Sequence, residues 1–316
     1  MNNIFADYII SFRQKHSITQ NEIIELLGHY DEQFSKLDIT TISRWENRKT
    51  VPSLAKQILV VRALGGNASD ILSHHCGAPL TNDEYLKPFA VRTTNPYSLS
   101  VPSFNVSLSD SLIQESDSLV PESDTLNKIM IFHDNFIKMP IDIHSKIEKN
   151  KVRLKTIYDY EKNLSGHSLY GFCTIKNLKQ HPEMDYITCI DTHMTIDETE
   201  LQEEHLVMNV LSSYSSTAYA KVINFIKLIQ RLNSMPSIKT LIITVQFQEI
   251  YNFFDTLQGV RVIEKGKKVK YGGIRFGTQN YSYLRLYVKP EYLLAVKELM
   301  TFSVHSDHYL NSLLSK

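Results

Sequence analysis

A short turn of small and hydroxyl-bearing residues joins a strand-like run to a helix-like run in the second half of the chain. The strand-like run covers residues 205–211 and the helix-like run covers residues 221–232. Backbone N–H groups that converge at a helix N-terminus can hold a pyrophosphate when no side chain blocks its approach. The residues of this turn that could contact such a ligand are Val210, Ser213, Tyr214, Ser215, Ser216, Thr217, Ala218, Tyr219 and Ala220. The turn lacks glycine, and its only basic residue, Lys221, follows the bend, so a phosphate site and a plain turn both fit the pattern.

The same turn resembles the acyl-CoA loop of the GNAT superfamily of N-acetyltransferases, in which a strand ending in valine leads through Tyr-Arg-Gly-x-Gly-x-Gly/Ala into a helix. Tyr214 takes the tyrosine position and Ser215 takes the basic position, while Ser216, Ala218 and Ala220 replace the glycines. The resemblance implies an α+β domain with acyl-CoA or acetyl-CoA as its ligand. Because Ser215 carries no charge, the pattern favours an altered ligand pocket over acetyl transfer.

Residues 238–266 are similar to the strand, helix and strand that follow the loop in that superfamily. A tyrosine often acts there as general acid, but Phe254 occupies the position and cannot donate a proton, which leaves Tyr251 as the alternative. The candidates for a general base are Asp191, His193, Glu198, Glu200, Glu203 and Glu204. Four carboxylates in a polar loop are typical of a solvated surface, and a histidine on a strand is usually structural. We therefore assign no catalytic residue.

Near the N-terminus, the sequence predicts two short helices that carry small polar and basic side chains. Thr19 can cap the first helix while Glu22 reaches back to it, and Asp38 can cap the second, whose inner face holds Ile42 and Trp45. Short polar side chains can reach base edges in a major groove, and basic ones can contact phosphate or guanine. The candidate DNA-contacting residues are Thr19, Gln20, Thr40, Thr41, Ser43, Arg44, Asn47, Arg48 and Lys49.

These residues resemble the XRE, or lambda-repressor-like, helix-turn-helix family. The matching segments are Thr19-Gln20, Leu27-Gly28, residues 41–46, residues 52–54 and residues 63–65. The resemblance implies that the helix beginning near Asp38 lies in the major groove of a double-stranded DNA operator. One departure is the insertion HYDEQFSK at residues 29–36, which must lengthen the preceding helix or expand the turn.

Charge limits how this segment could bind DNA. Residues 1–66 carry eight basic and seven acidic side chains, so one copy neutralises few phosphates. A homodimer on a two-fold operator would double the contacts, and we expect one. The whole chain has a formal net charge of zero, so any polyanion must bind a local patch. Residues 261–275, with six basic residues and one acid, form such a patch. It is interpreted as a charged surface hairpin, and the alternative is a second phosphate contact, for DNA or for the 3′-phosphate of CoA.

The chain is expected to divide into three segments. Residues 1–75 are predicted as an all-α helix-turn-helix domain, residues 76–125 as an acidic linker that contains serine and proline, and residues 126–316 as an α+β GNAT-like domain with a mixed, largely antiparallel sheet flanked by helices. Within the last segment, apolar periodicity predicts helices over 141–162, 217–232 and 248–257, and strands over 168–176, 185–196, 205–213, 238–245, 260–266 and 282–289.

Composition indicates the cellular compartment. Three widely spaced cysteines argue against a disulfide scaffold and fit a reducing cytoplasm. No apolar run reaches the roughly 18 residues that a membrane span needs, so no membrane partner is expected. His74, His75 and Cys76 have no partner cluster at metal-ligand spacing, so no metal site is predicted.

Together these patterns predict a cytoplasmic, sequence-specific DNA-binding transcriptional regulator. Its C-terminal domain would dimerise, sense an acyl-CoA or another small ligand, or do both. The alternative is a DNA-associated N-acetyltransferase that uses acetyl-CoA. A third interpretation is a GNAT-like domain that serves only assembly.

Overall fold

A computed structural model describes residues 4–81, 84, 114–118, 123–139, 142–149, 151–159, 161–197, 201 and 205–314. These residues form two compact units. The helical unit comprises Met1–Pro79, Ile229–Pro236 and Glu291–Ser306, and the sheet unit comprises Leu80–Leu228, Ser237–Pro290 and Asp307–Lys316.

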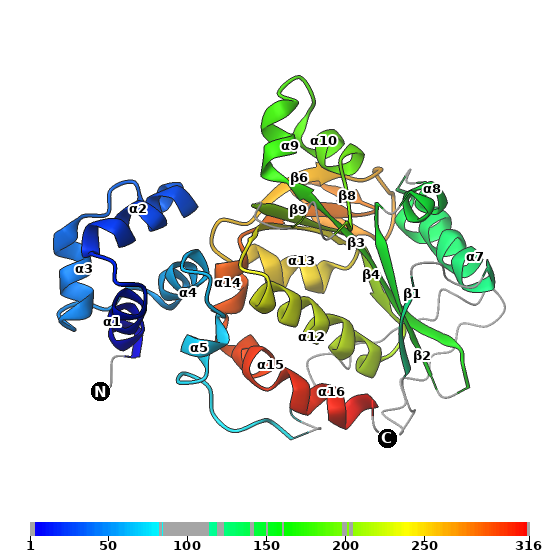
Figure 1. Cartoon of the computed structure of the whole chain (residues 1–316). Helices are drawn as coiled ribbons and strands as arrows, with labels where there is room; N and C mark the ends of the chain where they lie inside the picture. Colours follow the sequence, from blue (N-terminus) through cyan, green and yellow to red (C-terminus); the bar gives the residue numbers. More distant parts are fainter. Residues whose placement is uncertain are drawn as a thin grey trace. The chain divides into compact units, whose positions relative to one another are not determined.

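Short helices make up the helical unit (Figure 1). In its N-terminal segment they are α1 (Ile4–His16), α2 (Gln20–Tyr30), η1 (Glu32–Phe34), α3 (Ile39–Glu46), α4 (Leu54–Ala63) and α5 (Ser69–Leu72). Two of the predicted caps are confirmed. Thr19 and Glu22 form a reciprocal capping box on α2, and the Asp38 carboxylate accepts a hydrogen bond from the Thr41 N–H at the start of α3. The insertion at residues 29–36 both extends α2 to Tyr30 and adds η1.

Apolar side chains from several helices form the core of the helical unit. Ile9, Ile23, Leu27 and Ile42 are fully buried together, and the rings of Phe5 and Trp45 pack edge-to-face with centroids 5.5 Å apart. Burial of each such aliphatic side chain stabilises the fold by about 1.5–3 kcal/mol. Ile42 and Trp45 thus belong to the core, as predicted, and leave the other side of α3 to solvent.

The helical unit also includes two segments from far along the sequence. Arg62 is 1% exposed, and its guanidinium donates to the carbonyl oxygens of Leu232, Met235 and Pro236. The Tyr30 hydroxyl donates to the Pro236 carbonyl over 2.7 Å. The bond to Leu232 satisfies a carbonyl group in the last turn of the helix Ala218–Ser234, which leaves it without an intrahelical partner. The bonds to Met235 and Pro236 hold the segment that follows this helix. The predicted segment of residues 1–75 did not include this second part.

The sheet unit is built on a seven-stranded sheet with the order β1-β2-β3-β4-β5-β9-β6. Its strands are β1 (Gln114–Ser118), β2 (Arg153–Tyr158), β3 (Leu164–Thr174), β4 (Leu206–Ser215), β5 (Ile238–Val245), β6 (Arg261–Lys265) and β9 (Leu284–Val288). β4 and β5 are parallel, and the other neighbouring pairs are antiparallel. A separate hairpin joins β7 (Ile274–Phe276) to β8 (Gln279–Tyr281). The predicted mixed, largely antiparallel sheet is therefore present.

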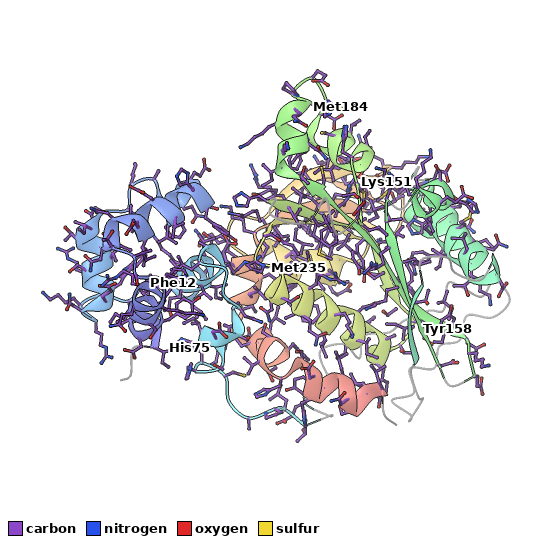
Figure 2. All side chains as sticks on the ribbon, viewed as in Figure 1. Phe12, His75, Lys151, Tyr158, Met184 and Met235 are labelled. Atoms are coloured by element: carbon purple, nitrogen blue, oxygen red, sulfur yellow. The ribbon has the colours of Figure 1, made fainter. Side chains whose placement is uncertain are left out.

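The remaining helices are α7 (Ser123–Phe132), η3 (His133–Ile137), α8 (Ile143–Glu148), α9 (Ile175–Gln180), α10 (Tyr186–Thr192), α12 (Ala218–Ser234), α13 (Gln248–Asp255), α14 (Pro290–Leu294), η4 (Lys297–Leu299), α15 (Met300–Val304) and α16 (Ser306–Leu314). In the sheet unit, α12 and α13 lie on one side of the sheet, and α7 and α8 lie on the other (Figure 1). Ile129 of α7 and Ile143 and Ile147 of α8 join Leu169 and Leu211 in one buried cluster. Side chains fill the layers between the helices and the sheet (Figure 2).

Two predicted elements in this unit are wrong. Residues 185–196 contain the helix α10 rather than a strand. The Asp185 carboxylate caps this helix at its N-terminus by accepting a hydrogen bond from the Thr188 N–H. Residues 141–162 contain the six-residue helix α8, followed by the strand β2, rather than one long helix. For the short apolar run of residues 185–196, periodicity alone does not separate helix from strand. In the longer segment, α8 ends at Glu148 and the strand β2 begins at Arg153.

Strand β1 lies inside the predicted linker of residues 76–125 and pairs antiparallel with β2, with Gln114 opposite Tyr158. Most of the rest of that linker lies outside the described residues. In the part of the chain that the structure describes, no helix is long and apolar enough to cross a membrane.

Candidate functional site

The parallel strands β4 and β5 separate along their length. They pair as far as Val210 opposite Ile243, after which β4 continues to Ser215 and β5 continues to Val245 without further pairing to each other. Beyond this point β4 pairs with β3 and β5 pairs with β9. The two strands therefore open into a cleft at their carboxyl ends, where a crossover helix, α12, begins.

A bulge in β4 accounts for the opening. Opposite β3, Ser212 pairs with Leu169 and Val210 pairs with Tyr170, so Leu211 is an extra residue on β4. A β-bulge bends its strand and increases the local twist. Here it lies directly after the last pair between β4 and β5, so it turns the end of β4 away from β5.

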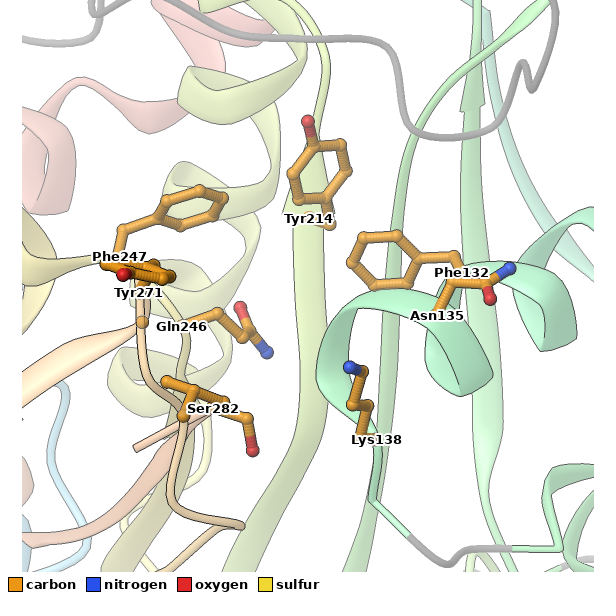
Figure 3. A pocket seen from close by; sticks show the side chains of 10 residues that line it. Phe132, Asn135, Lys138, Tyr214, Gln246, Phe247, Tyr271 and Ser282 are labelled. Atoms are coloured by element: carbon orange, nitrogen blue, oxygen red, sulfur yellow. The ribbon is translucent and has the colours of Figure 1, made fainter. Parts of the chain in front are cut away.

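A cavity of about 270 Å³ lies where the two strands have diverged. Its lining residues are Phe132, Asn135, Lys138, Tyr214, Gln246, Phe247, Val269, Tyr271, Gly273 and Ser282 (Figure 3). They come from η3 and its flanks, from the ends of β4 and β5, and from the segment around the β7–β8 hairpin. The sequence predicted Tyr214 as a ligand contact. Val269, Tyr271 and Gly273 lie in the basic segment of residues 261–275, and the other six lining residues belong to no predicted site.

Three aromatic rings form one side of the cavity. The Phe132 and Tyr214 rings are tilted with centroids 4.8 Å apart, and the Tyr214 and Phe247 rings lie 5.9 Å apart. Phe132 is 2% exposed, whereas Phe247 is 42% exposed. This wall is suited to an apolar group, and the exposed ring of Phe247 lies at its solvent side.

Polar side chains face the same space. Figure 3 shows the Lys138 ammonium and the Gln246 amide directed toward the cavity from opposite sides. The Gln246 Nε2 and the Ser282 Oγ are buried atoms without a hydrogen-bond partner among the described residues. Lys138 ends η3 in a left-handed conformation with φ 56°, which is unusual for a residue other than glycine. The cavity therefore offers one cation and two unused polar groups.

The turn between β4 and α12 uses several of its own polar groups. The Ser216 N–H donates to the Ser165 carbonyl over 2.7 Å, and its hydroxyl donates to the same oxygen over 3.0 Å. Thr217 accepts from the Ala220 N–H and so caps α12. Ser215 is 4% exposed and accepts from the Asn224 amide. Two of the N–H groups in the turn that was predicted to hold a pyrophosphate are thus already hydrogen-bonded within the protein.

Packing also explains the small residues of the turn. Ala218 is 3% exposed and Ala220 is fully buried. A Cβ at Gly166 of β3 would lie 3.2 Å from the Tyr214 carbonyl oxygen and 3.3 Å from the Ala220 Cβ. The turn can lie this close to β3 because Gly166 has no side chain and Ala220 has a small one. Val210 is also buried, while Ser213, Ser216, Thr217 and Tyr219 are partly exposed.

A basic residue does lie beside the turn. Lys221, in the first turn of α12, is partly buried, and this burial lowers the pKa of its ammonium, while the Glu249 carboxylate acts in the opposite direction. Glu249 is in the first turn of α13, so Lys221 faces the side of the cleft where both helices begin. A partly desolvated cation interacts more strongly with an anion than one in bulk water does.

The two residues at and near the predicted general-acid position, Phe254 and Tyr251, contact other parts of the protein and not the cavity. The Tyr251 hydroxyl donates to the Asp255 carboxylate over 2.9 Å, and burial together with this contact raises the pKa of Tyr251 to about 12. Phe254 is 4% exposed and belongs to the core. Neither residue lines the cavity.

The candidates for a general base divide into two groups. Glu198, Glu200, Glu203 and Glu204 lie outside the described residues. Asp191 makes a two-pronged contact with the Arg285 guanidinium, with both distances 2.8 Å. His193 lies on the turn after α10, not on a strand, and its ring stacks on His181 at 4.3 Å. These contacts give Asp191 and His193 structural roles.

Sequence reasoning missed a buried polar chain behind the aromatic wall. The Ser212 hydroxyl lies 2.8 Å from His133 Nε2 and 2.9 Å from His167 Nε2. Burial lowers the pKa of His133 to about 4 and that of His167 well below its usual range, so both rings are neutral at pH 7. Both rings also contact the Phe132 ring. The chain therefore fixes the position of the aromatic wall.

Several of the predicted DNA-contacting residues bond within the helical unit. Thr19 forms the capping box, and the Gln20 amide donates to Glu46. Arg48 is paired with Asp7 at 2.5 Å on the surface, and the Asn47 amide donates to the Ser43 carbonyl over 2.8 Å. Thr40, Arg44 and Lys49 are exposed, and Thr41 is partly exposed. Of the nine, Thr19 and Gln20 lie at the start of α2, and the other seven lie on α3 or directly after it, with Gln20 and Arg48 held by acidic partners.

The structure also describes the basic segment of residues 261–275 and the side chains that could bind a metal. The basic segment of residues 261–275 includes β6 and leads into the β7–β8 hairpin. In the described part of the chain, no three His, Cys, Asp or Glu side chains gather as a metal-binding group.

No protein-family model matches the sequence, and no curated protein sequence matches it either. Solved structures do match part of the chain. Arabidopsis thaliana NAA60 in complex with acetyl-CoA is 14% identical, with a TM-score of 0.33, over 56% of this chain and 98% of that chain. FeeM, an N-acyl amino acid synthase from uncultured soil microbes, is 12% identical, with a TM-score of 0.35, over 59% of this chain and 98% of that chain.

Spermidine N-acetyltransferase from Vibrio cholerae, in complex with CoA and spermine, is a third such structure. It is 12% identical, with a TM-score of 0.32, over 58% of this chain and 98% of that chain. Identities and scores of this size do not identify a ligand, a substrate or a catalytic residue of this chain. The sheet of this chain is mixed and mostly antiparallel, and its one parallel pair among the described strands, β4 and β5, diverges.

Proposed function

We propose that the sheet unit binds an acyl-CoA thioester in the cleft between β4 and β5 and transfers the acyl group to an amine. The observation that carries this proposal is the divergence of the two strands after Val210 and Ile243. Along residues 211–215, the side of β4 that faces the cleft has no β-strand partner in β5. An extended ligand that carries amide groups can hydrogen-bond to such an exposed edge as an added strand would. The pantetheine arm of CoA carries two amides and is such a ligand.

The start of α12 is suited to the anionic end of the same ligand. Anions are stabilised at helix N-termini, and α12 is a 17-residue helix whose first turn carries Lys221. Because the Ser216 and Ala220 N–H groups are already bonded, a pyrophosphate would depend on Lys221 and the remaining N–H groups of the turn. This is weaker support than a glycine-rich loop would give.

Acyl transfer requires a neutral amine nitrogen that attacks the thioester carbonyl carbon. A C–N bond forms, the C–S bond breaks, CoA leaves as its thiolate, and the amine loses a proton. Among the described residues that line the cavity there is no carboxylate or imidazole to accept that proton. The amine would then have to bind in its neutral form, so the rate should rise with pH up to the pKa of the free amine. Binding without turnover would leave the sensor interpretation in place.

Lys221→Met is expected to weaken the binding of acetyl-CoA and octanoyl-CoA about tenfold, because one charge-assisted contact to the pyrophosphate is lost. Isothermal titration calorimetry measures the dissociation constants, and release of free CoA thiol in the presence of amines measures turnover. Lys179→Met, on the exposed side of α9, is the matched control and should change neither value. No binding of either thioester by the wild-type protein would refute the proposal.

A second function is favoured by the helical unit. We propose that it binds double-stranded DNA through α3, as a homodimer on a two-fold site. The support is the capped helix α3, whose buried side holds Ile42 and Trp45 while Thr40 and Arg44 are exposed. Glu46, at the end of α3, contacts Arg13 of α1 at 2.6 Å and Gln20 at the start of α2 at 2.5 Å, which holds the three helices together. Arg48 would have to leave Asp7 to contact a phosphate, and an exposed pair of this kind costs little to break.

Arg44→Ala is expected to weaken binding to a selected operator by about 1–3 kcal/mol and to relax base preference at one position. The site is first selected from a random DNA library, and fluorescence anisotropy at fixed salt then gives both affinities. Lys15→Ala, at the exposed end of α1, is the control for loss of one positive charge. If the two variants lose the same affinity and keep the same base preference, Arg44 does not read bases.

A further inference from the structure

The unused polar groups of the cavity indicate what binds there. We infer that Lys138, Gln246 and Ser282 form a subsite for the carboxylate of a small ligand with an apolar body. The observation is that three hydrogen-bond donors from three separate segments face one cavity. The inference deepens the proposed function, on which it rests for the role of the ligand as the amine-bearing acyl acceptor.

The first argument is the cost of leaving these donors unpaired. Ser282 is 7% exposed, and its Oγ and the Gln246 Nε2 have no hydrogen-bond partner among the described residues. A buried polar group without a partner is rare in native proteins and is strongly unfavourable. Ordered water could satisfy such groups, but two of them in one cavity beside an ammonium are also what a bound acid requires. A carboxylate accepts hydrogen bonds at both oxygens.

The second argument is charge. Lys138 is the one residue with a formal charge among those that line the cavity, counted over the described part of the chain. It therefore matches a ligand group of charge −1 better than a phosphate monoester, which carries a charge of about −1.5 to −2 at pH 7. The Lys138 N–H donates to the His133 carbonyl over 2.7 Å, which ends η3. We therefore assign a carboxylate rather than a phosphate to this subsite.

The third argument is the shape of the opposite wall. Phe132, Tyr214 and Phe247 present rings to the same cavity, and they can cover an aromatic or aliphatic side chain. The volume of about 270 Å³ is slightly below the range that drug-sized ligands occupy. An amino acid with an apolar side chain carries all the required groups: a carboxylate, an apolar body and the amine that would attack the thioester.

The test is a pair of ligands that differ only in the acid group. Binding of 3-phenylpropionate and 3-phenylpropionamide to the full-length protein is measured by ligand-observed NMR, with no CoA present. We expect the acid to bind about tenfold more tightly than the amide, as one charged hydrogen bond would provide. Lys138→Met and Gln246→Glu should abolish this preference and leave amide binding unchanged, which also shows that both variants are folded. Lys179→Met should keep the preference.

Equal binding of acid and amide by the wild-type protein would overturn the inference, as would a preference that survives in both cavity variants. The result is separable from that of the proposed function, because acyl-CoA binding is measured in a different experiment. Preference for the acid without any binding of acyl-CoA would support the carboxylate subsite and refute the thioester site. Binding of acyl-CoA without preference for the acid would support the thioester site and refute the carboxylate subsite.

Discussion

Arg285→Met is expected to lower the free energy of unfolding of the protein by about 3–5 kcal/mol, which is the usual cost of removing one partner from a buried ion network. Arg285, on β9, is 1% exposed and donates to three groups. It contacts Asp191 at 2.8 Å, Glu264 at 2.9 Å and the Asn209 side-chain oxygen at 3.0 Å. Without the guanidinium, two carboxylates lie close together with no cation between them.

Urea denaturation followed by circular dichroism measures the change. Arg261→Met is the matched control, because Arg261 is exposed on the neighbouring strand β6 and lies 4.4 Å from the Tyr287 ring. It should cost no more than about 1 kcal/mol, as an exposed cation–π contact does. Similar losses for the two variants would contradict a structural role for the Arg285 network.

Gly171→Ala is expected to destabilise the protein by about 1–3 kcal/mol through overpacking. A Cβ at Gly171, on β3, would lie 2.5 Å from the Lys151 carbonyl oxygen and 2.6 Å from the Met194 Cε. The methionine side chain can move, but the Lys151 carbonyl belongs to the backbone that leads into β2. The strand or its neighbour must therefore shift.

Gly28→Ala is the control variant, measured by the same urea denaturation, and it is expected to change stability in the opposite direction. Gly28 lies within α2, and a Cβ there would meet nothing within 4 Å. Alanine is favoured over glycine in a helix by about 1 kcal/mol, so this variant should be more stable than the wild type. Stabilisation by both alanines would show that β3 has room at Gly171.

Local signals made the helical unit predictable. The capping box of Thr19 and Glu22 and the cap of Asp38 act within four residues, so the sequence displays them directly. Gly65, at φ 76°, follows the end of α4, and a glycine in this conformation is a local stop signal for a helix. By contrast, the Arg62 contacts link residues about 170 positions apart, and no periodicity reveals such a contact.

The sheet unit was predictable in outline only. Strand β4, helix α12, strand β5 and helix α13 follow clear apolar patterns, and all four are present. The apolar pattern of residues 185–196 predicts a strand, but Asp185 caps a helix there, α10, and periodicity does not separate the two in so short a run. The divergence of β4 from β5 depends on a bulge at Leu211, which is set by pairing with β3 rather than by local sequence.

In the candidate site, too, the sequence predicted the local feature and not the contacts between distant segments. The turn of residues 213–220 was identified from its composition, but its polar groups proved to be largely used within the protein. The cavity beside it depends on Lys138, Gln246 and Ser282, which come from distant segments and form no motif. Only the folded chain brings these three side chains together.

The most direct test of the central claim is amide hydrogen exchange measured with and without octanoyl-CoA. If the thioester lies along the open edge of β4, exchange should slow in peptides that cover residues 209–220 and 243–248, and it should be unchanged in α9. This result would place the ligand in the cleft between β4 and β5. Unchanged exchange in both peptides at a saturating concentration of octanoyl-CoA would contradict the account.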